Sequence, residues 1–370
     1  WLVYHRSTGN SEYLVLNEAY QSSAGPQFWD ATDSAFIINE PNLLTPGQDY
    51  VAYFFAHDDS DEGLIQCGSY TGTGAAGNEI DLGWEPQWLM IKNASSAAGW
   101  VMYDTMRGFG ANDIQRLLYA DTSAAEGDSG SVSLSSTGFD AGGGQSAAWV
   151  ASNKVNDEYI YMAIRRPNKP ASEFEAEELF SIVNNGPTST GLLEHPHLAD
   201  FSFYKYTAGS QSHGVQDRLR GPGDLSFDST AAESSLIGMN EWDMMEGYLN
   251  PNIGPSSGYY NSWAFRRAPG FVDVVAYEGS GDINPVEPHN LGVVPEMMWI
   301  KNRDYAHQWT VYHKDVSAEA PHFELALNSD AKLADPSTTY YPFADVPTAT
   351  DMLLRDGYGS SKVGDSHIAY

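Results

Sequence analysis

Carboxylate side chains that could act as a general acid and base gather in one short segment. Glu79, Asp81 and Glu85 stand together in Glu-Ile-Asp-Leu-Gly-Trp-Glu. A retaining glycoside hydrolase needs two carboxyl groups about 5–5.5 Å apart. Along an extended strand, Glu79 and Glu85 would lie about 20 Å apart at roughly 3.3 Å per residue. The spacing therefore favours a solvated edge strand over a catalytic pair.

The same stretch resembles the acidic strand motif of laminarinase-type glycoside hydrolases, which use a related sandwich fold. That family places its last glutamate closer to the aspartate than the four positions that separate Asp81 from Glu85. The corresponding stretch of a second copy, residues 282–287, lacks the arrangement. We predict no catalytic residues.

Two other segments carry side chains that bind metals. Residues 57–63, His-Asp-Asp-Ser-Asp-Glu-Gly, offer oxygens to calcium, but an EF-hand loop starting at Asp58 would need an acidic residue where Ser69 stands. A calcium loop of another kind stays open beside the favoured interpretation, a solvated turn. His195-Pro-His197 places two imidazoles on one side of an extended segment. A single copy does not define a metal site, so we predict neither metal nor cofactor, with calcium as the open alternative.

The single cysteine, Cys67, follows the apolar strand pattern of residues 64–66 and is expected to be a buried, inert thiol. One cysteine excludes an internal disulfide. The sequence contains no phosphate-binding loop, no His-Glu-x-x-His and no Cys-x-x-Cys. The motifs therefore predict a protein that is not an enzyme.

The composition bounds the class of protein. The 370 residues carry a net charge of −30, with 42% hydrophobic and 13% aromatic residues, so the chain should fold. The acidic balance excludes a general nucleic-acid binder and argues against anionic membranes. No apolar run reaches the roughly 18 residues of a membrane span. Both ends, at Trp1 and Tyr370, have strand-like patterns, which predicts a fragment of a longer polypeptide.

Internal repeats organise the chain. Residues 82–93 recur at 291–302, and a tryptophan follows eight residues after the lysine of each copy. A further four residues on comes a polar side chain, and weaker copies keep the spacing. The equivalent positions are Lys92, Trp100 and Asp104; Lys205, His213 and Asp217; Lys301, Trp309 and His313; and Trp1 and His5.

A closing strand also recurs, starting at Tyr50, Tyr159, Tyr260 and His367, so the unit has about a hundred residues. We name four segments accordingly. Repeat 1 (1–64) is the C-terminal part of a truncated β-repeat, repeat 2 (65–170) a β-sandwich repeat, repeat 3 (171–270) a degenerate β-repeat with a short helical linker at its start, and repeat 4 (271–370) a truncated β-repeat.

The segments between turns are short and rich in Val, Ile, Tyr, Trp and Phe, at a spacing typical of antiparallel sheets. We predict an all-β fold of tandem β-sandwich repeats, jelly-roll or lectin-like, with little helix. An opening strand should end in a Gly-rich turn at residues 70–74 and 277–281. One helix is expected over residues 172–180.

The recurrent tryptophans, Trp1, Trp100 and Trp309, are expected in the core. Trp84 has a valine in the corresponding copy and is expected to be exposed, with Trp88 at the same strand parity. An exposed indole could stack on a sugar ring, so Trp84 and Trp88 are the candidate ligand-binding residues. Arg107 and Arg220 each follow an aspartate by three positions, and both are expected to be structural, either pairing with that aspartate or packing across the turn.

Several phrases in combination resemble a repeat domain of marine bacteriophage virion proteins, of the kind found in phages of cyanobacteria. They are Tyr-Val-Ala-Tyr-Phe-Phe-Ala-His-Asp (50–58), Cys-Gly-Ser-Tyr-Thr-Gly (67–72), Leu-Gly-Trp-Glu-Pro-Gln-Trp-Leu-Met-Ile-Lys-Asn (82–93), Tyr-Ile-Tyr-Met-Ala-Ile-Arg-Arg-Pro (159–167) and Arg-Arg-Ala-Pro-Gly-Phe (266–271). The resemblance brings no established functional residues.

The resemblance implies a non-enzymatic virion protein, a tail or tail-fibre segment, located in the virion and extracellular once released. The implied partners are other virion proteins and a host-surface polysaccharide, with a homotrimer by analogy and neither nucleic acid nor membrane insertion. Variable loops at 236–258 would carry receptor contacts. Two alternatives stay open: a secreted carbohydrate-active protein, either a laminarinase-like hydrolase or a carbohydrate-binding module, and a decoration or spacer repeat without ligand.

Overall fold

The structure is a computed structural model of the 370-residue chain. It describes residues 1–24, 29–32, 35–38, 47–60, 63–111, 115–130, 132–142, 150–166, 171–185, 191–234, 242, 244–250, 260–317, 325–329, 342–357 and 359–370. The chain divides into two compact units, residues 1–167 and 168–370, and each is described by itself. In the described part of the chain, no helix is long and apolar enough to cross a membrane.

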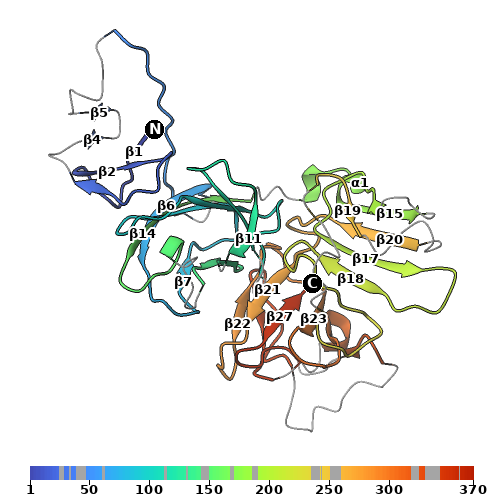
Figure 1. Cartoon of the computed structure of the whole chain (residues 1–370). Coiled ribbons are helices and arrows are strands. Elements are labelled where there is room, and N and C mark those ends of the chain that lie inside the picture. The colour runs from blue at the N-terminus through green and yellow to red at the C-terminus, as the bar shows by residue number, and fades with distance from the viewer. Residues whose placement is uncertain are drawn as a thin grey trace. The chain divides into compact units, whose positions relative to one another are not determined.

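The all-β prediction is confirmed: the chain forms antiparallel sheets with very little helix (Figure 1). A 3-10 helix at Ala171–Glu173 and the single-turn helix α1 (Ala176–Leu179) occupy the stretch where a helix was expected. A second single-turn helix, α2 (Lys314–Ser317), follows a strand of repeat 4.

Repeat 2 is a two-layer sandwich. Its six-stranded sheet has the order β11 (Gly127–Gly130), β10 (Gln115–Tyr119), β9 (Val101–Asp104), β8 (Pro86–Asn93), β14 (Glu158–Arg165), β6 (Ile65–Thr71). The smaller sheet has the order β12 (Ser133–Leu134), β13 (Gly138–Asp140), β7 (Glu79–Asp81). Phe139 of the smaller sheet meets Tyr70 and Tyr161 of the larger one edge-on, at 6.0 and 5.5 Å between ring centres.

Repeat 4 is built in the same way. Its larger sheet has the order β21 (Val275–Glu278), β27 (Ser366–Ala369), β23 (Met297–Asn302), β24 (Thr310–His313), β25 (Leu325–Ala326). A smaller sheet pairs β22 (Val286–Pro288) with β26 (Asp351–Leu353). Phe343 and Met352 pack against Tyr277, Met298 and Ile300 of the larger sheet, and this contact forms the core between the layers.

Repeat 3 keeps the larger sheet in the order β15 (Phe180–Asn185), β20 (Tyr260–Phe265), β17 (Phe201–Tyr206), β18 (Gly214–Asp217). Its second sheet pairs β16 (Leu192–Leu193) with β19 (Tyr248–Leu249). Alternate residues of β20 are buried, and Tyr260 and Ala264 pack against Leu193 and Tyr248 of the second sheet. The alternation is the period-two pattern of a half-buried strand.

Repeat 1 contributes two small sheets, β1 (Leu2–Val3) with β2 (Glu12–Val15) and β3 (Ser23–Ala24), and β4 (Trp29–Ala31) with β5 (Phe36–Ile38). Every sheet of the chain lies within one of the four predicted segments. In repeats 2, 3 and 4 the closing strand lies between the opening strand and the lysine-bearing strand. The exact segment boundaries and a jelly-roll or lectin-like strand order stay predictions.

Candidate functional site

An asparagine at the end of β8, next to a buried lysine, is held by the turn that precedes β14. The Asn93 side chain donates to Asp157 Oδ2 at 2.9 Å, and its oxygen accepts the backbone N–H groups of Ser95 and Ser96. Lys154 pairs with Asp157 at 3.0 Å. Asn93 is fully buried, and its amide is satisfied at both ends. We call four residues the clamp of repeat 2: Lys92, Asn93, Lys154 and Asp157.

Repeat 4 carries the same clamp. Asn302 donates to Asp365 Oδ2 at 2.8 Å and accepts the backbone N–H groups of Asp304 and Tyr305. Lys362 pairs with Asp365 at 3.2 Å. The clamp of repeat 4 comprises Lys301, Asn302, Lys362 and Asp365. The matching bonds of Asn93 and Asn302 show that the repeated sequence preserves a buried polar structure as well as a strand pattern.

The turn of each clamp has a sequence signature that sequence analysis missed. It reads Lys-Val-Asn-Asp at 154–157 and Lys-Val-Gly-Asp at 362–365. The third residue is left-handed in both, with φ of 63° at Asn156 and 72° at Gly364. Asn and Gly are the residues that adopt this conformation most readily. The repeated tetrapeptide could have revealed the clamp before the structure.

The lysine at the end of the lysine-bearing strand is buried in each clamp. Burial lowers the pKa of Lys92 and of Lys301 to about 8. A lysine with a depressed pKa can serve as a base or a Schiff-base nucleophile. Here each ammonium is bound by backbone carbonyls instead: Lys92 reaches Ala98 O at 2.5 Å, and Lys301 reaches Asn302 O at 2.7 Å. With no exposed surface on either side chain, no substrate reaches them. The lysines are structural.

A glycine after each opening strand allows the clamp turn to approach. The N–H of Gly72 donates to Asp157 O at 2.8 Å, and that of Gly279 donates to Asp365 O at 3.0 Å. A Cβ at either glycine would lie 2.1 Å from a lysine carbonyl oxygen of the turn. The Gly-rich turns predicted at 70–74 and 277–281 are confirmed, and their cause is this close backbone contact.

The predicted Asp–Arg pairs are confirmed. Arg107 Nε lies 2.5 Å from Asp104 Oδ2, and Arg220 Nε lies 2.5 Å from Asp217 Oδ2. In both pairs the arginine backbone N–H also donates to the aspartate. The pair in repeat 3 is fully buried, whereas the pair in repeat 2 is partly exposed.

Repeat 1 docks on repeat 2 through a tryptophan. The indole N–H of Trp100 donates to Val15 O at 3.0 Å, and the backbone N–H of Ser22 donates to Ala94 O at 2.9 Å. The apolar side chains packed at this contact are Val3, Leu14, Leu16, Met90, Ala120 and Ile160. The prediction that Trp100 lies in a core is therefore confirmed, and the core is the one between repeats 1 and 2. The same prediction is wrong for Trp1, which is 65% exposed.

Repeat 3 docks on repeat 4 through the equivalent tryptophan. The indole N–H of Trp309 donates to Ser226 O at 2.8 Å, and the backbone N–H of Glu233 donates to Arg303 O at 2.8 Å. The Phe227 ring packs on Trp309 at 5.2 Å. Positions in repeats 2 and 4 differ by 209 residues, and their partners in repeats 1 and 3 by 211. One docking interface thus occurs once in each compact unit.

The interface in the second unit has a buried polar centre. The Tyr370 hydroxyl donates to Asp217 at 2.5 Å and accepts from Arg220 at 3.0 Å, and its ring stacks on Phe201 at 4.2 Å. Burial raises the pKa of Tyr370, and the Asp217 carboxylate adds to the effect. A hydroxyl bonded to an ion pair fixes the orientation of the two repeats.

Repeat 3 has Tyr206 at the position of the clamp asparagine, and it carries a histidine cluster next to its second sheet. Ser181 Oγ lies 2.7 Å from His195 Nδ1 and 2.9 Å from His197 Nε2. His195 Nε2 lies 3.0 Å from Ser262 Oγ, and His197 Nδ1 lies 3.0 Å from Leu198 O. A carbonyl only accepts, so His197 carries its proton on Nδ1. It follows that Ser181 donates to His197, His195 donates to Ser181 and Ser262 donates to His195.

The chain of hydroxyls continues into the core. Ser202 donates to the Tyr248 hydroxyl at 2.9 Å, and that hydroxyl lies 3.1 Å from Ser262 Oγ. Burial lowers the pKa of His195 to about 4 and also lowers the pKa of His197. The imidazoles are therefore neutral at neutral pH, and every link has one donor and one acceptor.

The histidine cluster brings a base and hydroxyls together, as nucleophilic catalysis requires. His195 is only 2% exposed, so a substrate cannot reach this base or the hydroxyls bonded to it. Within the described ranges, no group of three or more His, Cys, Asp or Glu side chains could hold a metal ion. The arrangement fits a satisfied buried network.

The structure corrects one prediction about the candidate ligand residues. Trp84 is only 2% exposed, so the expectation of an exposed indole is wrong. Strand β8 begins at Pro86, so Trp84 lies in the preceding turn and the strand-parity argument does not apply to it. Trp88 is half-buried and pairs with Asp104 across β8 and β9. Trp84 and Trp88 therefore do not form a pair of exposed indoles on which a sugar could stack.

The carboxylates singled out by sequence do not form a pair. Glu79 and Asp81 are exposed on β7, the edge strand of its sheet, and Glu85 is buried. Asp81 accepts the N–H of Gly83 at 2.9 Å. The solvated edge strand is therefore confirmed.

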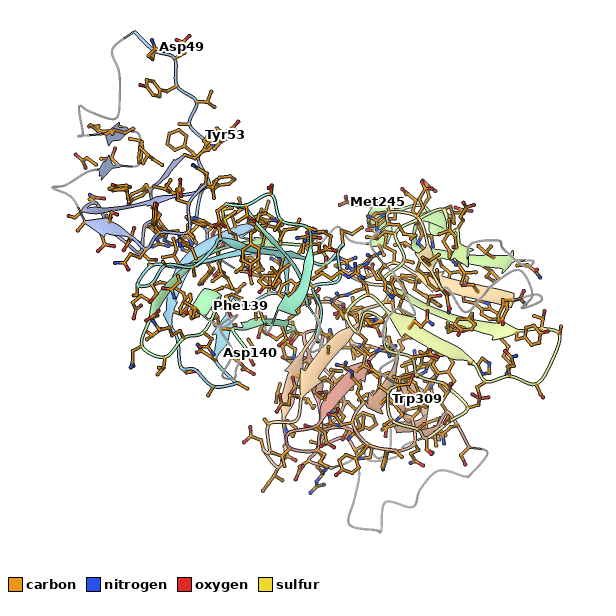
Figure 2. All side chains as sticks on the ribbon, viewed as in Figure 1. Asp49, Tyr53, Phe139, Asp140, Met245 and Trp309 are labelled. Carbon is orange, nitrogen blue, oxygen red and sulfur yellow. The ribbon has the colours of Figure 1, made fainter. Side chains whose placement is uncertain are left out.

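The remaining expected features are only partly described. Asp58 accepts the Ser60 N–H at 3.0 Å, while residues 61 and 62 of the calcium-like segment lie outside the described residues. Cys67 is half-buried, less than expected, and burial raises the pKa of its thiol. Of the predicted receptor loops at 236–258, only residues 242 and 244–250 are described, and Met245 there is exposed (Figure 2).

The sheets and buried networks define an all-β tandem-repeat protein. Residues 1–167 and 262–370 match a family described as a domain of unknown function, DUF7483, and the chain belongs to that family. The match leaves out residues 168–261, most of repeat 3, which holds the histidine cluster. No curated protein and no solved structure matches the chain.

Proposed function

We propose that the chain is a non-enzymatic structural and attachment protein, a tail or tail-fibre segment of the phage virion type that its phrases resemble. The observation that supports this most is the docking interface that recurs in both compact units. A repeated interface builds an extended array in which each repeat contacts its neighbours. Such an array suits a fibre that carries recognition loops away from a particle.

The fate of the reactive side chains supports a non-catalytic role. Lys92, Lys301 and His195 are buried and fully bonded, while Glu79 and Asp81 stand exposed at a sheet edge. A hydrolase would need carboxylates facing each other across a groove. In the described part of the chain these two carboxylates share a solvated strand instead.

We propose that repeat 3 carries the recognition of a host-surface polysaccharide. The family match ends before it and resumes at its closing strand, so this is the segment that departs from the repeated plan. The exposed Met245 lies within the predicted receptor segment 236–258, and exposed connecting segments can vary in sequence at little cost to a core. The acidic charge of the chain favours a neutral or cationic polysaccharide over a polyanion.

The test is a binding and hydrolysis assay with the purified chain on marine bacterial cells and their extracted polysaccharides, with and without calcium. We expect retention on at least one polysaccharide and no release of reducing ends. A variant with the exposed Met245 and Glu246 replaced by serine should lose retention, and its unfolding midpoint reports that it is folded. Release of reducing ends would overturn the non-enzymatic proposal, and absence of any retention would overturn the attachment role.

A further inference from the structure

Two buried oxygen atoms in repeat 3 belong to side chains that contact each other. Gln216, on β18, is only 1% exposed, and its Oε1 atom is buried. The Oδ1 atom of Asp224 is buried too, and the Asp224 carboxyl accepts a hydrogen bond from the Gln216 side chain. Among the described residues, neither Oε1 nor Oδ1 has a hydrogen-bond partner. Leaving two buried acceptors without a donor is costly, so a donor between them is expected.

The hydrogen bond between the two side chains fixes how they face each other. Gln216 can donate only through Nε2, and Asp224 accepts through Oδ2, because Oδ1 has no partner. A carboxyl and an amide that share one such bond can form a second, parallel bond between Oδ1 and Oε1 if one of these oxygens carries a proton. Only the carboxyl can carry it. A proton on Asp224 Oδ1 therefore gives all four atoms a partner.

Four titratable groups lie close enough to Asp224 to interact with it electrostatically. They are Arg220 in the turn after β18, Glu233, and the buried tyrosines Tyr204 of β17 and Tyr248 of β19. Burial raises the pKa of Asp224 to about 6, while Arg220 lowers it and Glu233 raises it. Arg220 would repel a metal cation placed beside Asp224, whereas a proton removes the carboxylate charge. The surroundings of Asp224 favour a proton over a metal ion.

Asp224 lies at the base of the segment that docks on repeat 4. Asp224 and Ser234 exchange backbone hydrogen bonds at 3.3 and 3.1 Å, which closes residues 224–234 into a loop. This segment carries Ser226, whose carbonyl oxygen accepts the Trp309 indole N–H at 2.8 Å. We call residues 224–234 the docking loop. A change in the bonding of the Asp224 side chain therefore acts at the point where the docking loop begins.

We propose that Asp224 binds a proton in the folded chain and that this proton holds the docking loop in place on repeat 4. In the protonated state, Asp224 Oδ1 donates to Gln216 Oε1, and Gln216 Nε2 donates to Asp224 Oδ2. When the proton passes to water, two acceptor oxygens face each other inside repeat 3. Water must then enter to supply donors, and the base of the docking loop opens. The docking of repeat 3 on repeat 4 is thereby sensitive to pH.

The direction of the pH effect follows from the raised pKa of Asp224, which is about 6 in the fold against an ordinary 3.8. The folded chain binds this proton more tightly than the unfolded chain does. The stabilisation is therefore complete below about pH 4 and is lost as the pH rises to about 6. Buried histidines of the same unit, such as His195 and His197, titrate in the opposite direction. Comparing two chains at each pH cancels their effect.

The test substitutes Asp224 by asparagine in the full chain. In Asp224→Asn the new amide donates to Gln216 Oε1 at every pH, so it imitates the protonated carboxyl. Hydrogen exchange of the docking loop is measured in both chains at pH 5.0 and 7.5. We expect Asp224→Asn to be better protected than the parent chain. The ratio of the two protection factors should be about tenfold larger at pH 7.5 than at pH 5.0.

Infrared difference spectra give an independent measurement of the proton itself. The spectrum of the parent chain minus that of Asp224→Asn should show the C=O band of a protonated carboxyl at pH 5.0. The band should be lost at pH 7.5. A difference spectrum without this band at pH 5.0 would overturn the proposal.

The matched control is Asp228→Asn, which changes an exposed carboxyl of the docking loop. Its protection relative to the parent chain should be equal at the two pH values, and unfolding midpoints report that each variant is folded. Lower protection in Asp224→Asn than in the parent chain at pH 7.5 would show that the ionised carboxylate is required, which overturns the proposal. A ratio that does not change with pH would also overturn it, as would calcium that restores protection to the parent chain alone.

Discussion

Repeats 2 and 4 share a clamp of a buried lysine, a buried asparagine, a buried aspartate and a second, more exposed lysine, whereas the sandwich of repeat 3 contains a cluster of histidines and serines. In repeat 3 the position of the buried lysine is occupied by the half-buried Lys205. The sheet order is nevertheless the same in all three repeats. The strand pattern therefore specifies the sheet without the clamp.

The difference teaches what the clamp is for. It ties the turn before the closing strand to the end of the lysine strand and to the glycine after the opening strand. Repeat 3 has Tyr206 where the clamps have an asparagine, and its described residues hold the histidine cluster as a buried polar network. That substitution falls in the part of the chain that the DUF7483 match leaves out. We infer that repeats 2 and 4 form the structural framework shared within the family. We infer that repeat 3, which departs from it, has a role particular to this chain.

The largest expected effect comes from the glycines that the clamp turn touches. Gly72→Ala and Gly279→Ala would each place a Cβ 2.1 Å from a carbonyl oxygen. Because backbone must move on both sides, we expect each substitution to lower the free energy of unfolding by about 3 kcal/mol. Chemical denaturation of the two variants measures it. Gly209→Ala, in an exposed turn of repeat 3, is the control, and equal losses in all three variants would contradict the comparison.

A pH effect of the buried lysines comes next. The pKa of Lys92 and of Lys301 is lowered to about 8 in the fold, so the unfolded chain binds more protons above pH 8. Stability should therefore rise as the pH increases from about 8 to 9.5, by about 1.5 kcal/mol for each lysine. Above about pH 10, buried tyrosines with raised pKa values oppose the gain. Denaturant midpoints follow the effect, and Lys92→Met with Lys301→Met should abolish it while Lys205→Met should not.

Acid should destabilise the second compact unit more than the first. Burial lowers the pKa of several histidines in the second unit, namely His195, His197, His213, His289, His307 and His367, and of His5 in the first. The unfolded chain binds these protons below about pH 6.5, so stability falls from there toward about pH 4. We expect about 1 kcal/mol for His195 between pH 6 and 5.

Hydrogen exchange at pH 7.0 and 5.0 measures this effect for each unit separately. Residues 168–370 should lose protection first, and His195→Gln should reduce the loss. A uniform loss over both units, unchanged by His195→Gln, would argue against the histidine cluster as a titrating centre.

A smaller effect is expected at the two docking tryptophans. Trp100→Phe and Trp309→Phe each remove an indole N–H bond to a carbonyl that keeps its own local bond. We expect a loss of about 0.5–1 kcal/mol in each, confined to the unit that carries the substitution. Thermal unfolding with domain-resolved exchange checks it. Unequal losses, with one variant unaffected, would show that the two interfaces are not equivalent.

The smallest effect is expected at the exposed carboxylates. Glu79→Gln and Asp81→Asn change solvated side chains at a sheet edge, so the free energy of unfolding should change by less than about 0.5 kcal/mol. Retention on polysaccharide should also be unchanged. A loss of any hydrolytic activity in these variants would return them to a catalytic role.

Much of the framework was predictable from sequence because it depends on local spacing. The interval from Lys92 to Trp100 recurs from Lys301 to Trp309, and this spacing indicated the repeats. The three-residue interval from an aspartate to Arg107 and to Arg220 indicated the Asp–Arg pairs. The burial of Trp84 was not predictable. Strand β8 begins at Pro86, two residues after Trp84, so the alternation of side chains along the strand does not apply to Trp84. His195 and His197 find their partners on Ser181 and Ser262, which lie in other strands. No local pattern encodes that contact.

The central claim is that the same type of clamp occurs once in each unit and stabilises that unit. Hydrogen exchange of Asn93→Ala and Asn302→Ala tests it most directly. Each substitution leaves a buried carboxylate without its amide donor, at a cost of about 1–3 kcal/mol. We predict that Asn93→Ala lowers protection only within residues 1–167, that Asn302→Ala lowers it only within residues 168–370, and that the two losses are similar. If either variant keeps full protection, or both lose it throughout the chain, the account is contradicted.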